Sequence, residues 1–347
     1  MPRNSQIHTM SANSPHASLY EAFRDPVTHV DLQPVREGLA NGSSTAFEFM
    51  DGDPGVVDFM APSPASAADE ANLKMYNDES STEKYRNFLR WLFKTFEVDE
   101  DWFRADLLSR LAITDGMKVL VVGCGLGEDV ALIQNDIGAT GQVHAQDISK
   151  SMVKAARASI HAPNVCFSVS NALKLPYKSR YFDVVFHFGG INLFGDLKQA
   201  ISELERVCKI GGRVVFGDEG IAPHLRGTEY ADVLIHNNPL WALEAPMREL
   251  PSNADAVTLE YLLGNCFYLI TFTPGEGFPK VNLDVPHVGA RGGSARTRYY
   301  GRLEGVSVET KRKLLDAAQA RGISMHDLLE QVIGAQLADA QPRSPQT

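Results

Sequence analysis

The stretch that most constrains the fold of this chain is Lys118 to Val130, with the sequence KVLVVGCGLGEDV. It opens with consecutive apolar residues, as is typical of a central parallel strand that is covered by helices on both faces. The apolar run ends in a glycine turn at Gly123 to Gly127, and a helical pattern follows from Glu128 to Ile137. A strand, a glycine turn and a helix in this order present backbone N–H groups and a helix N-terminus to an anionic part of a ligand.

A second strand, expected at Gln142 to Gln146, ends in the acidic residue Asp147. A carboxylate at this place, about 20 residues after the glycine turn, can accept hydrogen bonds from both hydroxyls of a ribose. The glycine spacing is G-x-G-x-G and not G-x-G-x-x-G, and such a turn alone often only lets a strand meet a helix. The turn and Asp147 together favour a cofactor that contains a nucleoside.

Residues from about 73 to 273 resemble the class I S-adenosylmethionine-dependent methyltransferases that methylate quinones and other small molecules. Four segments carry the resemblance in the order of the family, namely VLVVGCGLG, AQDIS, NALKLPYKSRYFDVVF and LERVCKIGGRVVFGD. The resemblance implies an α/β fold with a seven-stranded, mostly parallel, doubly wound (Rossmann-like) sheet and a closing antiparallel hairpin. It also implies an enzyme that uses S-adenosyl-L-methionine as its cofactor.

The resemblance further implies which residues bind this cofactor: Tyr76, Gly123, Cys124, Gly125, Gly127, Asp147, Ile148, Asn171, Ala172 and His187. Tyr76 would face the sulfonium in a cation–π contact, or it is an ordinary core aromatic residue. Asn171 stands where the family usually has an acid, and its carbonyl oxygen could accept a hydrogen bond from the adenine amino group.

Candidates for a general base follow the fourth and fifth expected strands, because chemistry in open α/β sheets gathers at the C-terminal ends of strands. They are His187, Asp218, Glu219 and His224. The unperturbed pKa of a histidine suits a base, although His187 could equally be hydrogen-bonded within the pocket wall. A base is needed only if the methyl acceptor must lose a proton, and no metal is expected.

Composition divides the chain into several expected parts around the methyltransferase domain at 71–273. They are a disordered tail at 1–18, a small β-rich leader or arm at 19–61, a linker at 62–70, a basic Gly/Arg loop region at 274–304, a two-helix extension at 305–338 and a disordered tail at 339–347. The leader resembles the zinc-ribbon-like unit of some methyltransferases, including ribosomal-RNA guanine methyltransferases. Those carry C-P-x-C where this chain has Asp25-Pro26-Val27-Thr28, so we expect no metal there.

The segment after the domain is the one locally basic stretch of an acidic chain. Arginines between Pro286 and Arg302 could hold an anionic acceptor, or the stretch is a solvated loop or a partner contact. The two expected helices after it resemble a ribbon-helix-helix unit. The sequence therefore predicts either a homodimer or a helical extension that packs on the core.

The net charge of −10 argues against a nucleic-acid or anionic-membrane partner. No apolar run approaches the length of a membrane span, and the chain begins without a signal pattern. The four cysteines lack C-x-x-C spacing and are expected to be reduced, which favours a cytoplasmic protein.

We therefore expect methyl transfer to an O, N or C nucleophile of a small molecule, such as a secondary metabolite or a quinone-like compound. Two alternatives stay open at this point. One is an RNA methyltransferase, which the leader suggests, and the other is a non-enzymatic dimeric regulator that senses the cofactor through the C-terminal unit.

Overall fold

The computed structural model describes residues 16–42, 44–60, 70, 74, 76, 80–289, 292–300 and 306–339. Most of the expected tails at 1–18 and 339–347 and of the expected linker at 62–70 lies outside these residues. The chain forms two compact units, Met1–Pro279 and Lys280–Thr347, which are described separately.

One mixed sheet organises the first unit, and its strand order is β1-β2-β3-β4-β7-β6-β5-β8-β9-β11-β10. The strands after the leader are β5 (Lys118–Val122), β6 (Gln142–Asp147), β7 (Val165–Val169), β8 (Phe182–Phe188), β9 (Cys208–Glu219), β10 (Ala254–Leu262) and β11 (Phe267–Pro274). In the run β7-β6-β5-β8-β9, each strand pairs in parallel with the next. Strand β11 pairs antiparallel with both β9 and β10. The predicted doubly wound α/β fold with a closing antiparallel hairpin is therefore confirmed.

The number of strands differs from the prediction, because the sheet has eleven strands where seven were expected. The leader contributes the additional strands β1 (Gln33–Val35), β2 (Gly38–Asn41), β3 (Ser44–Phe49) and β4 (Val56–Asp58). Strand β4 pairs in parallel with β7. The reason is that β7 would otherwise be an edge strand with unpaired backbone groups, and β4 satisfies them.

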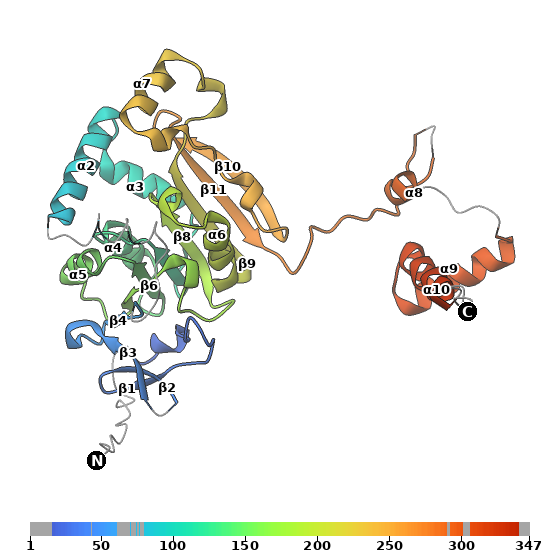
Figure 1. Cartoon of the computed structure of the whole chain (residues 1–347), viewed down its shortest axis with the longest axis horizontal. Coiled ribbons are helices and arrows are strands. Elements are labelled where there is room, and N and C mark those ends of the chain that lie inside the picture. The colour runs from blue at the N-terminus through green and yellow to red at the C-terminus, as the bar shows by residue number, and fades with distance from the viewer. Residues whose placement is uncertain are drawn as a thin grey trace, which may run out of the picture. The chain divides into compact units, whose positions relative to one another are not determined.

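Side chains of β5 alternate between two cores, one on each face of the sheet. Val119 and Val121 belong to the core that faces α3 (Glu100–Ser109), α4 (Glu128–Asp136) and α5 (Lys150–Ser159). Leu120 and Val122 belong to the core that faces α6 (Leu197–Val207). Helix α2 (Ser81–Thr95) packs on the first face, and Figure 1 shows α2 to α5 on the side opposite to α6.

The leader also covers part of the α6 face. The ring of Phe23 stacks on Tyr177 with 5.1 Å between centroids, and the Tyr20 hydroxyl donates to the Pro54 carbonyl oxygen over 2.6 Å. The Asp25 carboxylate accepts from the N–H groups of Val27 and Thr28 at 2.8 and 3.0 Å. Asp25 stands where the zinc-ribbon-like leaders have the first cysteine of C-P-x-C. Hydrogen bonds to its carboxylate thus close the turn at this place.

The strand order creates a switch point between β5 and β8, where ligands bind in sheets of this kind. The chain between β9 and β10 forms a cap that includes α7 (Glu229–Asn237) and the short helices η5 (Pro223–Leu225), η6 (Pro239–Ala242) and η7 (Met247–Glu249) (Figure 1). In the described residues no helix combines the length and the apolar character that crossing a membrane requires.

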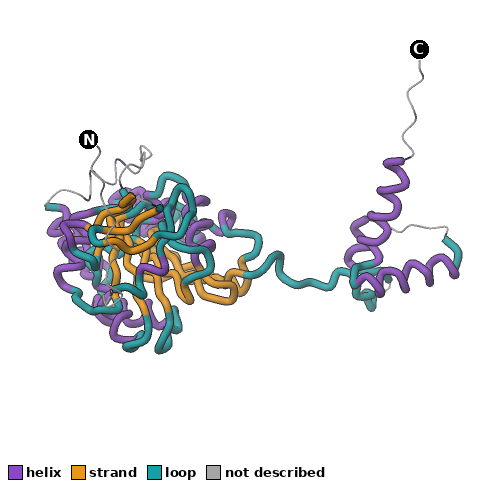
Figure 2. The backbone as a smooth tube through the Cα atoms, turned by 90° about the horizontal axis from the view of Figure 1, so that it is seen from below, coloured by secondary structure: helices purple, strands orange, loops and turns teal. Residues whose placement is uncertain are grey.

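The described part of the second unit contains a non-helical segment, drawn teal in Figure 2, and three helices, drawn purple. It contains α8 (Ala295–Tyr300), α9 (Val308–Arg321) and α10 (Met325–Asp339). Helix α9 ends at Gly322, which adopts a left-handed φ of 64°. Ser324 stands immediately before α10, and its hydroxyl oxygen accepts from the Asp327 N–H over 3.1 Å.

Candidate functional site

The glycine turn after β5 needs glycine because its backbone is left-handed. The φ angles of Gly123, Gly125 and Gly127 are 64°, 53° and 88°. A β-carbon at Gly123 would also lie 3.1 Å from the imidazole of His187. Gly127 is the N-cap residue of α4, so the turn delivers bare backbone to the N-terminus of that helix.

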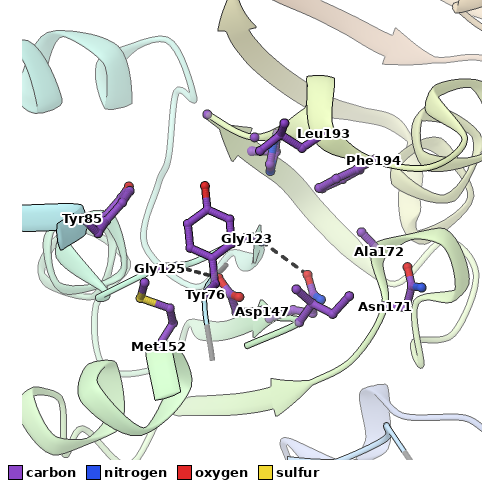
Figure 3. Close-up of a pocket in the computed structure, with 15 residues that line it drawn as sticks. Tyr76, Tyr85, Gly123, Gly125, Asp147, Met152, Asn171, Ala172, Leu193 and Phe194 are labelled. Carbon is purple, nitrogen blue, oxygen red and sulfur yellow. Dashed lines mark hydrogen bonds between the residues drawn. The ribbon is translucent and has the colours of Figure 1, made fainter. Parts of the chain in front are cut away.

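Asp147 at the end of β6 lies against this turn. Its Oδ2 accepts from the Gly125 N–H and its Oδ1 from the Ser149 N–H, both over 2.9 Å (Figure 3). Burial raises the pKa of Asp147, and the backbone N–H groups of Ser149, Gly125 and Ile148 act in the opposite direction. The structure therefore brings together the two features on which the sequence interpretation depends.

A cavity opens over the glycine turn and Asp147 (Figure 3). It is lined by Tyr76, Tyr85, Gly123, Gly125, Gln146, Asp147, Ile148, Met152, Asn171, Ala172, His187, Gly189, Gly190, Leu193 and Phe194. We call it the cofactor cavity. Two residues of the predicted cofactor set do not line it: Cys124 lines the neighbouring cavity described below, and Gly127 lines neither cavity.

The cofactor cavity offers apolar surface against which a flat heterocycle can pack. Ile148, Met152 and Ala172 offer apolar surface there. The Asn171 carbonyl oxygen accepts from the Leu173 N–H over 2.9 Å and so caps η3 (Ala172–Lys174). An amide oxygen has a second lone pair, which an adenine amino group can use.

Tyr76 lines both this cavity and the next, and Figure 3 shows its ring in the middle of the pocket. The hydroxyls of Ser149 and Ser151 donate to its carbonyl oxygen over 2.8 and 2.7 Å. Burial raises the pKa of the Tyr76 phenol, and the carboxylates of Glu219 and Asp147 add to this effect. The phenol therefore stays protonated at the junction of the two cavities.

His187 sits in the wall of the cofactor cavity as a neutral imidazole. Burial lowers its pKa, and its Nδ1 lies 2.8 Å from the Val122 carbonyl oxygen, to which the N–H donates. Its Nε2 is buried and has no hydrogen-bond partner among the described residues. The nitrogen that could accept a proton thus has no open surface toward an acceptor in this conformation.

The other base candidates are placed differently from what the sequence suggested. Asp218 is fully buried, and its two oxygens accept from the N–H groups of Asn192 and Glu219 at 2.7 and 2.9 Å. It lines neither cavity, because both oxygens are turned toward the backbone. His224 is exposed in η5 and also lines neither cavity, so we correct its assignment as a base.

A second cavity of about 390 Å³ adjoins the cofactor cavity, and we call it the acceptor cavity. The two cavities share Tyr76, Tyr85, Gly123, Gly189, Gly190 and Leu193. Most of its other lining residues are apolar, and they come from α2, α3, β8, the cap and the β10–β11 hairpin: Phe88, Leu89, Leu92, Phe93, Phe103, Leu107, Phe188, Leu240, Leu263 and Phe267. Glu219 from the end of β9 also lines it.

Sequence reasoning missed nearly all of the acceptor cavity. The sequence could not show it, because an apolar stripe on a helix such as α2 or α3 looks the same whether it faces a cavity or a filled core. Of its lining residues, Gly123 and Cys124 after β5, Phe188 and the glycines at the end of β8, and Glu219 at the end of β9 stood at a strand end, where a site residue is expected.

The comparisons with known proteins agree with this geometry. The model of a family described as a methyltransferase domain matches residues 113–255. A demethylmenaquinone methyltransferase of Geobacillus sp. (strain WCH70) is 28% identical over 149 residues, which are 42% of this chain and 58% of that protein. The ubiquinone/menaquinone biosynthesis C-methyltransferase UbiE of Psychromonas ingrahamii is 34% identical over 107 residues, which are 30% of this chain and 43% of that protein.

The chain spans about half the length of the curated relatives it matches. Among solved structures, a Haemonchus contortus phosphoethanolamine N-methyltransferase 2 in complex with S-adenosyl-L-methionine superimposes with a TM-score of 0.48 at 13% identity, covering 61% of each chain. The family match and the curated relatives identify the central part of the molecule. The chain carries a class I S-adenosylmethionine-dependent methyltransferase domain similar to those of ubiquinone and menaquinone biosynthesis.

Proposed function

We propose that this protein transfers the methyl group of S-adenosylmethionine to a nucleophilic atom of a small molecule. The observation that supports this most directly is the pair of adjoining cavities. One is built on the glycine turn and Asp147, and the other is largely apolar and shares Tyr76 with the first. A regulator that only senses the cofactor has no use for the second cavity.

The residues of the cofactor cavity fit the parts of this cofactor. Asp147 would accept from the ribose hydroxyls, and the turn at Gly123 and Gly125 would let the methionine part approach the backbone closely. Ile148 and Met152 would hold the adenine. When bound, S-adenosylmethionine supplies an electrophilic methyl group on a sulfonium.

The remaining work of the protein is positioning and exclusion of water. Tyr76 lies where both ligands would meet, so its ring can cover the sulfonium side while its hydroxyl faces the acceptor cavity. The apolar walls of the acceptor cavity keep water away from the nucleophile. None of the base candidates is required for an acceptor that is already nucleophilic.

Calorimetry with S-adenosylhomocysteine tests the cofactor part of the proposal. We expect Asp147→Ala to weaken binding by about 100-fold, because two hydrogen bonds to a carboxylate are lost. Asp316→Asn in α9 is a matched control, since Asp316 is exposed and belongs to the other unit, and it should bind as the natural protein does. Undetectable binding by the correctly folded natural protein would contradict the proposal.

Transfer itself is tested by incubating the protein with methyl-labelled S-adenosylmethionine and a metabolite extract, followed by mass spectrometry. A labelled product that the Asp147→Ala variant does not form supports a small-molecule methyltransferase. Labelled RNA in a parallel incubation with total RNA, and no labelled metabolite, would instead support the alternative.

The C-terminal unit supports a separate proposal, that it joins two copies of the chain. Ala318 and Leu328 are its buried apolar side chains among the described residues, whereas Leu315, Val332 and Leu337 are 51%, 44% and 65% exposed. Two helices with so small a core gain stability when exposed apolar side chains become covered. We expect light scattering to show a dimer that Leu315→Glu converts to a monomer, and a monomeric natural protein would contradict this.

The basic stretch before these helices does not support binding of an anionic acceptor. Arg296 is paired with Asp284 over 3.1 Å, and the Arg298 side chain donates to the Gly292 carbonyl oxygen over 3.0 Å. Arg291 and Arg302 lie outside the described residues. A cytoplasmic location stays a prediction that rests on the cysteine pattern of the sequence.

A further inference from the structure

A short loop after β8 forms part of the wall that the two cavities share. Its residues Gly189, Gly190 and Leu193 line both cavities, and Phe194 lines the cofactor cavity (Figure 3). The loop contains η4 (Ile191–Leu193), and we call residues 189–194 the η4 loop. A displacement of this loop therefore changes the cofactor cavity and the acceptor cavity together.

The η4 loop begins with two residues that give it little packing of its own. The φ angle is 82° at Gly189 and 106° at Gly190, and a β-carbon at either position would meet nothing within 4 Å among the described residues. Glycines have more conformational freedom than other residues. Ile191 packs into the core on the α6 face, but apolar contact is not directional. The orientation of the loop therefore depends on its hydrogen bonds.

Asn192 makes three hydrogen bonds that join the η4 loop to the sheet. Its backbone N–H donates to Oδ2 of Asp218 over 2.7 Å, and its side-chain N–H group donates to the Glu219 carbonyl oxygen over 2.8 Å. The Tyr268 hydroxyl donates to the side-chain oxygen of Asn192 over 3.0 Å. Asp218 and Glu219 end β9, whereas Tyr268 stands on β11. Two neighbouring strands thus fix the place of Asn192.

The partners of Asn192 belong to the sheet and do not depend on the loop for their own positions. Asp218 and Tyr268 are fully buried and stand opposite each other in the antiparallel ladder of β9 and β11. The second oxygen of Asp218 accepts from the Glu219 N–H over 2.9 Å. Asn192 itself lines neither cavity, so it acts on bound ligands only through the loop.

We propose that Asn192 is a positioning residue for methyl transfer, which holds the η4 loop against β9 and β11 so that the shared wall is formed before a ligand binds. The inference rests on the proposed function, because it assigns a residue to that reaction. It also gives Asp218 a purpose other than that of a base, namely to receive the Asn192 N–H. A wall that is already ordered strengthens binding, because no free energy is lost in ordering it.

Two buried tyrosines offer a matched pair of variants. Tyr268→Phe removes the hydroxyl that donates to Asn192. Tyr177→Phe removes a hydroxyl that is hydrogen-bonded to Ser168 over 2.8 Å. Both tyrosines are fully buried in the core on the α6 face, and neither lines either cavity. Each variant loses one buried hydrogen bond, so urea denaturation should show similar losses of stability.

Binding of S-adenosylhomocysteine should separate these two variants. Tyr268→Phe should bind this nucleoside about fivefold more weakly than the natural protein, because one hydrogen bond that orders the loop is lost. Tyr177→Phe should bind it within about twofold of the natural protein, because the changed group is remote from the cavities. A purely structural role of Tyr268 would lower the stability of both variants and the affinity of neither.

Asn192→Ala is the direct variant, and Asn253→Ala is its control. The Asn253 side chain also makes two hydrogen bonds, over 2.7 and 2.9 Å, and it lines neither cavity. Amide hydrogen exchange reports on the loop itself, because the Leu193 and Phe194 N–H groups donate to carbonyl oxygens within it. These two amides should exchange about tenfold faster in Asn192→Ala, and as in the natural protein in Asn253→Ala.

Either of two results would overturn the inference: equal affinity of Tyr268→Phe and Tyr177→Phe for S-adenosylhomocysteine, or unchanged exchange at Leu193 and Phe194 in Asn192→Ala. The natural protein keeps the two proposals apart. If it binds the nucleoside and the two tyrosine variants bind equally well, only the inference fails. If the folded natural protein does not bind the nucleoside, the proposed function fails and the inference fails with it.

Discussion

The cofactor cavity and the acceptor cavity lie side by side but are built on different principles. The first rests on the ends of neighbouring strands β5, β6, β7 and β8, where backbone groups and one carboxylate form the surface. The second takes side chains from α2, α3, the cap and β11, which are far apart in the sequence. The comparison teaches that one half of the site is a property of a local motif and the other half a property of the assembled fold.

The two buried carboxyl groups sharpen this contrast. Asp147 receives backbone N–H donors from the segment that follows β6 and from the glycine turn, which stabilise its charged form. Glu219 has an acid as its neighbour, which stabilises its protonated form. The first is suited to accept hydrogen bonds from a ribose, whereas the proton of the second is held in the pair with Asp218.

The largest expected effect tests whether the acceptor cavity can be changed without harming the cofactor cavity. Phe103→Ala removes a buried ring and should lower the free energy of unfolding by about 3 kcal/mol. The affinity for S-adenosylhomocysteine should stay within about twofold, because Phe103 lines only the acceptor cavity. Chemical denaturation and calorimetry measure both quantities.

Phe88→Ala is the control for this change, since Phe88 lines the same cavity but is 38% exposed, and it should cost less than about 1 kcal/mol. A tenfold loss of nucleoside affinity in Phe103→Ala would show that the two cavities are not independent.

The next effect concerns the protonated state of Glu219. The pKa of Glu219 is raised from 4.5, the ordinary value of a glutamate, to about 9 in the folded protein. Between pH 4.5 and pH 9 the folded state therefore binds one more proton than the unfolded state. The free energy of unfolding of the natural protein should therefore fall as the pH rises, by at most about 1.4 kcal/mol per pH unit. Glu219→Gln lacks this dependence.

The difference between the two proteins should reach about 2 kcal/mol from pH 6 to pH 8, measured by urea denaturation at each pH. Unfolding curves that shift in parallel with pH would mean that Glu219 is ionised and that the contrast with Asp147 is wrong.

The smallest effect compares two glycines with the same backbone conformation. Gly123→Ala and Gly211→Ala both place a side chain at positive φ, 64° and 76°, and each should cost about 1 to 2 kcal/mol. A β-carbon at Gly211 has nothing within 4 Å, whereas one at Gly123 approaches His187. Only Gly123→Ala should weaken binding of S-adenosylhomocysteine, by about tenfold. Equal binding by both variants would refute a special role of the turn.

Much of the fold was predictable because its signals are local. The apolar run of β5 predicted a central parallel strand with helices on both faces, and the family resemblance implied the doubly wound sheet that the structure has. The four leader strands were not predicted as part of it, because pairing between β4 and β7 joins residues more than 100 positions apart. Their sequence shows short β runs but not the edge on which they pair.

The candidate site divides in the same way. The side chain of Asp147 lies against the glycine turn, as its position after a strand suggested. Asp218 lies near the end of β9 and His224 follows that strand, yet Asp218 is turned toward the backbone and His224 is exposed. Position after a strand fixes the edge of the sheet on which a residue lies, but not the direction of its side chain.

The sequence by itself determined the parallel core, the glycine turn and the kind of cofactor that such a turn serves, because these depend on residues a few positions apart. Only the tertiary structure decided the walls of the acceptor cavity, the extension of the sheet by the leader and the proton on Glu219. The physical reason is that apolar enclosure and the pKa of a buried acid depend on which distant side chains replace water around a group, and no local pattern specifies them.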